Sequence, residues 1–146
     1  MDTHKVNTSE QPISAISQLA TDVVDAIRGY ETMIDLADED LRPVVERLHA
    51  LHNTHAGPLL TMLDELGGSP DEVGSAFAMV HRAVAKTRNL FGALDSSAVR
   101  QIVDGEERLV NSYSNAISNS GSQPEYRNIL SDQRDELRAE ITTLRT

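Results

Sequence analysis

Apolar residues recur at alternating steps of three and four in four long segments of the chain, which is the pattern of a helix with one face turned to a core. We call the residues that share such a helix face a seam, and the first seam consists of Ile13, Ile16, Ala20, Val23, Ile27, Tyr30, Ile34 and Ala37. The second reads Leu41, Val45, Leu48, His52, His55, Leu59, Met62 and Leu66. The third reads Val99, Val103, Glu106, Val110, Tyr113 and Ile117, and the fourth Tyr126, Leu130, Gln133, Leu137, Glu140 and Leu144. Three of the four seams therefore carry polar groups near their middle.

Helix-capping and helix-breaking residues between the seams predict where the helices begin and end. We expect helices at about 11–38, 41–66, 71–91, 96–118 and 124–145, which form a single domain over 11–146 behind a flexible N-terminus of residues 1–10. Gly67-Gly68 predicts a left-handed stop for the second helix, and Asp95 or Ser96 predicts a cap for the fourth. No segment shows the alternation of a β-strand.

The lengths of these segments predict an all-α fold. Short turns join the first two long helices and the last two, so each pair forms a hairpin. The connection of about thirty residues between the hairpins contains the shorter helix 71–91, which is long enough to bring the chain back along the bundle. A four-helix bundle with one long helical crossover between its second and third helices is the ferritin-like arrangement.

In this topology the polar seam positions lie at one height. Counted at 1.5 Å per residue from the same end, Ile27, His52, Glu106 and Gln133 fall within one helical turn of each other. His55, Tyr30 and Tyr113 adjoin them. We therefore expect one polar layer at mid-height inside an otherwise apolar bundle.

Composition excludes several classes of function. The formal charge is −10, from 13 basic and 23 acidic side chains, so neither nucleic acid nor an anionic membrane is an expected partner. Aromatic residues make up 3% of the chain and tryptophan is absent, so there is no platform for stacking bases or sugars. With no cysteine, no signal peptide and no long apolar run, we expect a soluble, cytoplasmic protein.

Several short motifs resemble those of a known group. They are the turn Leu66-Gly67-Gly68-Ser69-Pro70, the spaced set Asp25, Gly29 and Tyr30, and the run Asp104-Gly105-Glu106-Glu107. With the helix lengths, these resemble the bacterial ferritin-like four-helix-bundle proteins of unassigned function, over about residues 16–145. The resemblance implies a bundle that in its di-iron members carries a Glu on each of two helices and a Glu-x-x-His pair on each of the other two.

This chain departs from that ligand pattern at most positions. Ile27 occupies the first carboxylate position, unless Glu31 reaches in from the flank, and His52 stands where the second helix would carry Glu. Glu106 matches, but the last pair reads Gln133 and Glu136. One central carboxylate is too few to balance two iron cations, so we do not expect a di-iron site.

Two interpretations of the polar layer remain open. In one, His52, His55 and Glu106 hold a single divalent metal such as zinc or iron, with Gln133 or water completing the site, because two His and one carboxylate form a known zinc ligand set. Pro58 favours this one, since it frees the carbonyl of Thr54 and can kink the helix. In the other, the same side chains satisfy each other and fix the alignment of the helices.

The function expected from these patterns is a non-catalytic ferritin-like bundle acting as a structural or interaction module, with a role in stress responses implied by the resemblance. The alternative is a mononuclear metal-binding protein with the His/His/Glu site. The chain carries no phosphate loop, nucleophile elbow or HExxH motif, so the sequence favours a protein that is not an enzyme. We also expect a homo-oligomer such as a dimer, or another protein partner, with the helix at 72–91 as the contact surface.

Overall fold

The computed structural model describes residues 10–67, 95–120 and 124–146 of the chain, and these form α-helices without any strand. The four long helices are α1 (Glu10–Leu36), α2 (Arg42–Glu65), α4 (Val99–Ser118) and α5 (Pro124–Arg145). A 3-10 turn, η1 (Ser96–Ala98), leads directly into α4. Among the described residues the protein is therefore all-α with four helices, as the seams predict.

The ends of the helices follow from local chemistry. Asp38 accepts hydrogen bonds from the backbone amides of Asp40 (3.1 Å) and Leu41 (2.9 Å), which closes the turn before α2. Gly67 has a positive φ of 85°, the left-handed conformation predicted for the stop after α2. Asp95 accepts from the amide of Ser97 at 2.9 Å, so it caps the start of η1 as predicted. Pro58 lies inside α2, which continues through it to Glu65.

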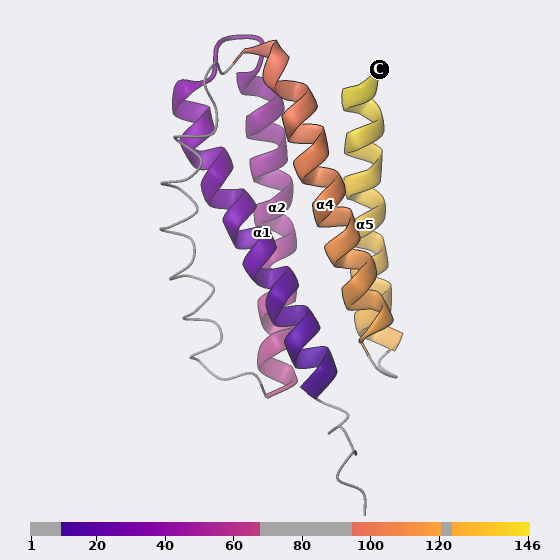
Figure 1. Ribbon diagram of the computed structural model, residues 1–146. Coiled ribbons are helices and arrows are strands. Elements are labelled where there is room, and N and C mark those ends of the chain that lie inside the picture. The colour runs from indigo at the N-terminus through magenta and orange to yellow at the C-terminus, as the bar shows by residue number, and fades with distance from the viewer. Residues whose placement is uncertain (1–9, 68–94, 121–123) are drawn as a thin grey trace, which may run out of the picture.

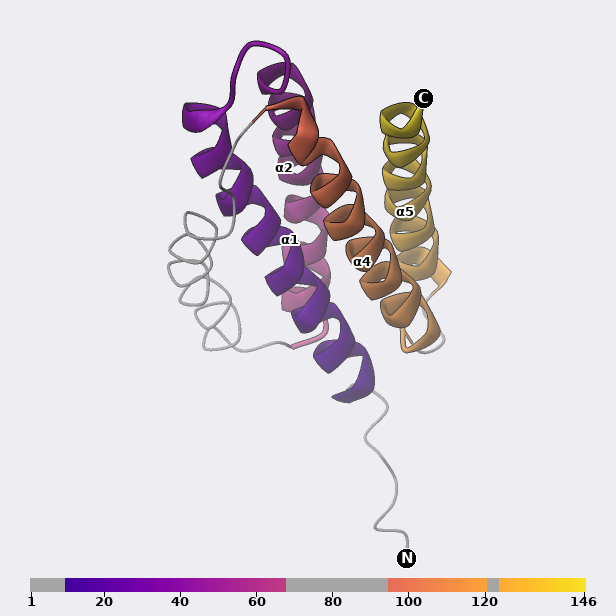
Figure 2. The same cartoon turned by 45° about the horizontal axis from the view of Figure 1, so that its top comes forward.

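The helices lie side by side along a common direction (Figures 1 and 2). α1 packs most extensively against α2, and α4 against α5, so each pair is a hairpin. α1 also packs along α4, and α2 contacts α5 less extensively. α2 and α4 both begin at the end of the molecule where α1 finishes (Figure 1).

The buried apolar residues form two separate clusters. One, toward the end where α1 starts, is built around Ile16, Leu19, Val23, Leu59, Met62, Leu63, Leu109, Leu130 and Leu137. The other, toward the end where α1 finishes, contains Tyr30, Met33, Ala37, Leu41, Val45, Leu48, Ala98 and Ile102. His52 and Glu106 belong to neither cluster, although both are buried.

Some predictions fall outside the described residues. The helix expected at 71–91, its crossover path, its role as a contact surface, and the N-terminal residues 1–9 all lie there. Within the described residues, no helix combines the length and the apolar character that a membrane crossing needs.

Candidate functional site: a buried polar layer

Six polar side chains from all four helices are buried at mid-height in the bundle. Tyr30 comes from α1, His52 and His55 from α2, Glu106 and Tyr113 from α4, and Gln133 from α5; we call these six the polar layer. The i, i+3 spacing of His52 and His55 puts both rings on the face of α2 that is turned inward. The structure thus brings together the six polar side chains that the seams placed at or beside one level, whereas Ile27, counted at the same level, belongs to an apolar cluster.

The centre of the polar layer is a direct contact between His52 and Glu106. The His52 ring donates through Nε2 to both carboxylate oxygens of Glu106, at 2.8 and 3.1 Å. The two side chains are 0% and 2% exposed. Tyr30 stacks on the His52 ring with the planes 2° apart and the centroids 5.8 Å apart. Burial, followed by the charge and hydrogen bonding of Glu106, raises the pKa of Tyr30 well above its usual value.

A second group of contacts surrounds His55. The Tyr113 hydroxyl donates to Gln133 Oε1 at 2.7 Å and lies 3.4 Å from His55 Nδ1. Gln133 Nε2 in turn donates to the backbone carbonyl of His55 at 3.3 Å. Burial, with smaller contributions from nearby carboxylates, also raises the pKa of Tyr113. These bonds join α2, α4 and α5 at the same level, and the His52 and His55 rings meet edge to face 6.3 Å apart.

The hydrogen-bond partners bear on where the ring proton of His55 lies. Tyr113 donates its only proton to Gln133, so its contact with His55 Nδ1 is a hydrogen bond only in the tautomer that carries the proton on Nδ1. In the neutral ring, Nε2 of His55 then carries a lone pair, and this buried atom has no hydrogen-bond partner. Its nearest acidic neighbour is Glu136 Oε1 at 3.6 Å. Desolvation lowers the pKa of His55, and it outweighs the opposing effect of Glu136, so the ring stays neutral at pH 7.

His52 presents a comparable situation. Its Nε2–H is used on Glu106, while its Nδ1 atom is buried and has no hydrogen-bond partner. The polar layer therefore contains two imidazole nitrogens, His52 Nδ1 and His55 Nε2, whose bonding capacity is unused. Buried polar atoms are normally paired, so these two atoms are the chemically available groups of the site.

The arrangement does not fit a di-iron centre. Ile27 is a buried apolar residue at the first carboxylate position, and Gln133 presents an amide where the fourth helix would present a carboxylate. A single metal bound by both His52 and Glu106 would hold their ligand atoms about 3.4 Å apart, since each lies about 2.0–2.2 Å from a tetrahedral ion. At 2.8 Å the two side chains instead contact each other directly. Within the described part of the chain, no three His, Cys, Asp or Glu residues are grouped so that they could hold a metal ion.

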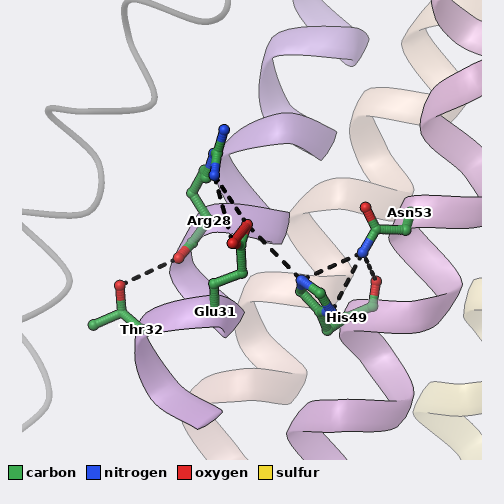
Figure 3. Close-up of polar contacts among 5 residues, drawn as sticks. All are labelled: Arg28, Glu31, Thr32, His49 and Asn53. Atoms are coloured by element: carbon green, nitrogen blue, oxygen red, sulfur yellow. Dashed lines mark hydrogen bonds and ion pairs between the residues drawn. The ribbon is translucent and has the colours of Figure 1, made fainter. Parts of the chain in front are cut away.

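Glu31, the other candidate for the first-helix carboxylate, lies outside the polar layer. Figure 3 shows it on the flank between α1 and α2, together with Arg28, His49 and Asn53. Arg28 Nη1 lies 3.3 Å from Glu31 Oε1, and His49 Nε2 lies 3.9 Å from the same oxygen. The Glu31 side chain is 42% exposed, so it cannot serve as an interior ligand in this conformation.

Two sets of neighbours were not expected from the sequence. Glu136 lies three residues after Gln133, and this spacing could have placed it near His55. On α1, Asp22 accepts from the Ser112 hydroxyl of α4 at 2.8 Å, while Asp25 has a buried oxygen with no hydrogen-bond partner. Burial, followed by the charge of Asp22, raises the pKa of Asp25. Neither Asp22 nor Asp25 stands on an apolar seam, so no helical pattern singles them out.

The comparisons with known proteins identify a family. Residues 11–119 match the model of a family described as Domain of unknown function (DUF2383), and the chain therefore belongs to that family. The match covers α1, α2 and α4, and with them every layer residue except Gln133. No curated protein and no solved structure matches the chain.

Proposed function

We propose that this member of the DUF2383 family is a non-catalytic, ferritin-like four-helix bundle that acts as a structural or interaction module. The resemblance of its motifs to the ferritin-like bundle proteins suggests a crossover helix between α2 and α4, and a role in stress responses. The common starting end of α2 and α4 supports that topology, because antiparallel hairpins joined by a short turn would place these two starts at opposite ends.

One observation carries the proposal, the hydrogen-bonded pair of His52 and Glu106. Glu106 is 2% exposed and both its oxygens lie within hydrogen-bonding distance of His52 Nε2, so the carboxylate is directed at the neighbouring helix and is not presented to a substrate from solvent. The pair joins α2 to α4, and therefore one hairpin to the other. Buried polar partners in a helical bundle favour one axial alignment over others that an apolar seam would tolerate.

This role can be tested by measuring helix alignment directly. The chain contains no cysteine, so spin labels can be attached at Ala50→Cys on α2 and Asp132→Cys on α5, both exposed. In the otherwise native chain we expect a single narrow distance distribution by electron paramagnetic resonance. Replacing the pair by His52→Leu and Glu106→Leu should keep the helices but broaden the distribution. An equally narrow distribution in the replaced protein would show that the polar layer does not set the alignment.

A single divalent ion is the second candidate, and one observation favours it. His52 Nδ1 and His55 Nε2 are buried lone-pair atoms without partners, which is the state that a metal ion requires of imidazole. Thermal melts with and without added Zn²⁺ or Fe²⁺ test this candidate, because an ion that binds only the folded state raises the melting temperature. The His52→Ala variant is the control. No rise in the native chain, or an equal rise in the variant, would remove the candidate.

A further inference from the structure

We propose that a groove between α4 and α5 binds the acidic corner between α1 and α2 of a second copy of this chain. The inference rests on the proposed function as an interaction module and names the partner of that module. Two surfaces carry it, one concave and basic, the other projecting and acidic.

The α4/α5 groove consists of two adjoining hollows of about 450 and 350 Å³. Glu107 and Arg145 line both hollows, so the two adjoin. On α4 its lining runs from Val99 to Asn111, a length of about 18 Å at 1.5 Å per residue. Its apolar lining residues are Val99, Val103, Val110, Ile141 and Leu144.

The charge of the α4/α5 groove is opposite to that of the chain as a whole. Its lining includes Arg100, Arg138 and Arg145 against Asp104 and Glu107, a net charge of +1, while the whole chain carries −10. Arg145 is paired with Glu107 at 2.7 Å. The groove thus presents Arg100 and Arg138 beside an apolar surface, which favours an acidic and partly apolar occupant.

The acidic corner, residues 35–42, supplies these properties. Leu36 is 57% exposed, and the only other large hydrophobic side chain exposed among the described residues is Ile129, at 37%. Four exposed carboxylates surround Leu36 in the sequence, namely Asp35, Asp38, Glu39 and Asp40. Arg42 is the one basic residue of the corner, and its guanidinium is held on the carbonyls of Ile34 (3.4 Å) and Ala37 (2.8 Å).

The corner lies at the end of the bundle where α4 begins and α5 ends (Figure 2), and these segments of α4 and α5 contribute to the lining of the groove. Leu36 is exposed in its own chain, so the groove is not filled by the corner of the same molecule. A second copy can insert Leu36 among the valines and isoleucine of the groove and place its carboxylates near Arg100 and Arg138. The contact joins two different surfaces, so it is heterologous.

A mixing experiment tests this contact. One variant removes the corner (Leu36→Ala with Glu39→Lys) and another removes the groove (Arg100→Glu with Arg138→Glu); Ile129→Ala is the control for an exposed apolar residue elsewhere. Sedimentation velocity from about 10 μM to about 1 mM should show association of the native chain and the control. Each of the other two variants alone should associate at least about tenfold more weakly. Mixed together they should form a dimer, because each retains the surface that the other lacks.

Two results would overturn the inference: a native chain that stays monomeric over the whole range, or variants that do not pair when mixed. Raising the salt concentration should also weaken the native association, since the arginine and carboxylate charges are exposed and are screened at high ionic strength. Melting temperatures of all variants, measured at a concentration where the native chain is dissociated, should lie close to the native one, because all the substituted side chains are exposed. If the chains do not associate but the melting temperatures are unchanged, the alignment role of the polar layer still stands. The two proposals can therefore fail independently.

Discussion

The strongest prediction concerns the pair His52 and Glu106, taken through a double-mutant cycle. The two single variants are His52→Leu and Glu106→Leu, and the third protein carries both. Each single substitution leaves a polar or charged group buried without its partner, at 0% or 2% exposure. Removing one partner of a buried pair costs about 3–5 kcal/mol of unfolding free energy, whereas replacing both by apolar residues is often neutral or even stabilising.

The cycle should therefore be strongly non-additive. If each single change costs about 3 kcal/mol and the double change costs about 1 kcal/mol or less, the coupling amounts to several kcal/mol, at or beyond the upper end of values for residues in contact. In a chain of this size, 3 kcal/mol corresponds to a fall in melting temperature of about 6–12 °C. The double variant should melt well above both single variants.

Urea unfolding followed by far-ultraviolet circular dichroism at pH 7 measures the cycle, with a chelator present so that no metal contributes. Glu106→Gln is a useful companion variant, because it keeps the shape and an acceptor oxygen and should cost less than Glu106→Leu. Additive single effects, within about 0.5 kcal/mol, would refute the reasoning. They would mean that His52 and Glu106 do not depend on each other for burial.

Three further predictions concern stability measured by the same unfolding assay. Leu48→Ala, at a fully buried position, should cost about 2–5 kcal/mol, whereas Leu36→Ala, at an exposed one, should change stability by less than about 0.5 kcal/mol; equal costs would contradict the core assignment. Asp25→Asn should raise the melting temperature slightly at pH 7 but not at pH 3. The pKa of Asp25 is raised in the folded state, so its ionisation opposes folding above the pKa that it has in the unfolded chain. A variant whose melting temperature exceeds the native one by no more at pH 7 than at pH 3 would contradict this. The pKa of His55 is lowered in the folded state, so at falling pH the imidazole is protonated in the unfolded chain before it is in the folded one. The free energy of unfolding should therefore fall as the pH drops below about 6.5, and it should fall less in His55→Gln. Identical pH profiles of the two proteins would contradict this.

The helices could be predicted from the sequence because periodicity fixes both the face and the height of a residue on a helix. The seams put Tyr30 and Gln133 at or beside the level of His52 and Glu106; in the structure Tyr30 stacks on the His52 ring, and Gln133 bonds Tyr113 and the carbonyl of His55. Periodicity does not determine which neighbour a flexible side chain selects. Glu31 has an arginine within reach on its own helix and turns to it.

The contact distances within the polar layer also could not be predicted. The same three residue types in the same layer are compatible with an ion between them or with a direct bond, and a difference of well under 1 Å between His52 and Glu106 separates these outcomes. Such a difference depends on the side-chain torsions and on the relative placement of α2 and α4. The two ring nitrogens without partners, His52 Nδ1 and His55 Nε2, follow from hydrogen-bond geometry, and a pattern of residue types does not contain that geometry.

The division of the apolar interior has a consequence for how this bundle tolerates change. Leu48 and Met33 pack toward one end and Leu59 and Leu130 toward the other, with His52 and Glu106 between the two groups. Ala26 packs against both groups, but elsewhere a change of side-chain volume at one end meets His52 and Glu106 before it reaches the other end, so its repacking stays mostly local. Each end can then diverge in sequence on its own, while this pair preserves the correspondence between the four helices.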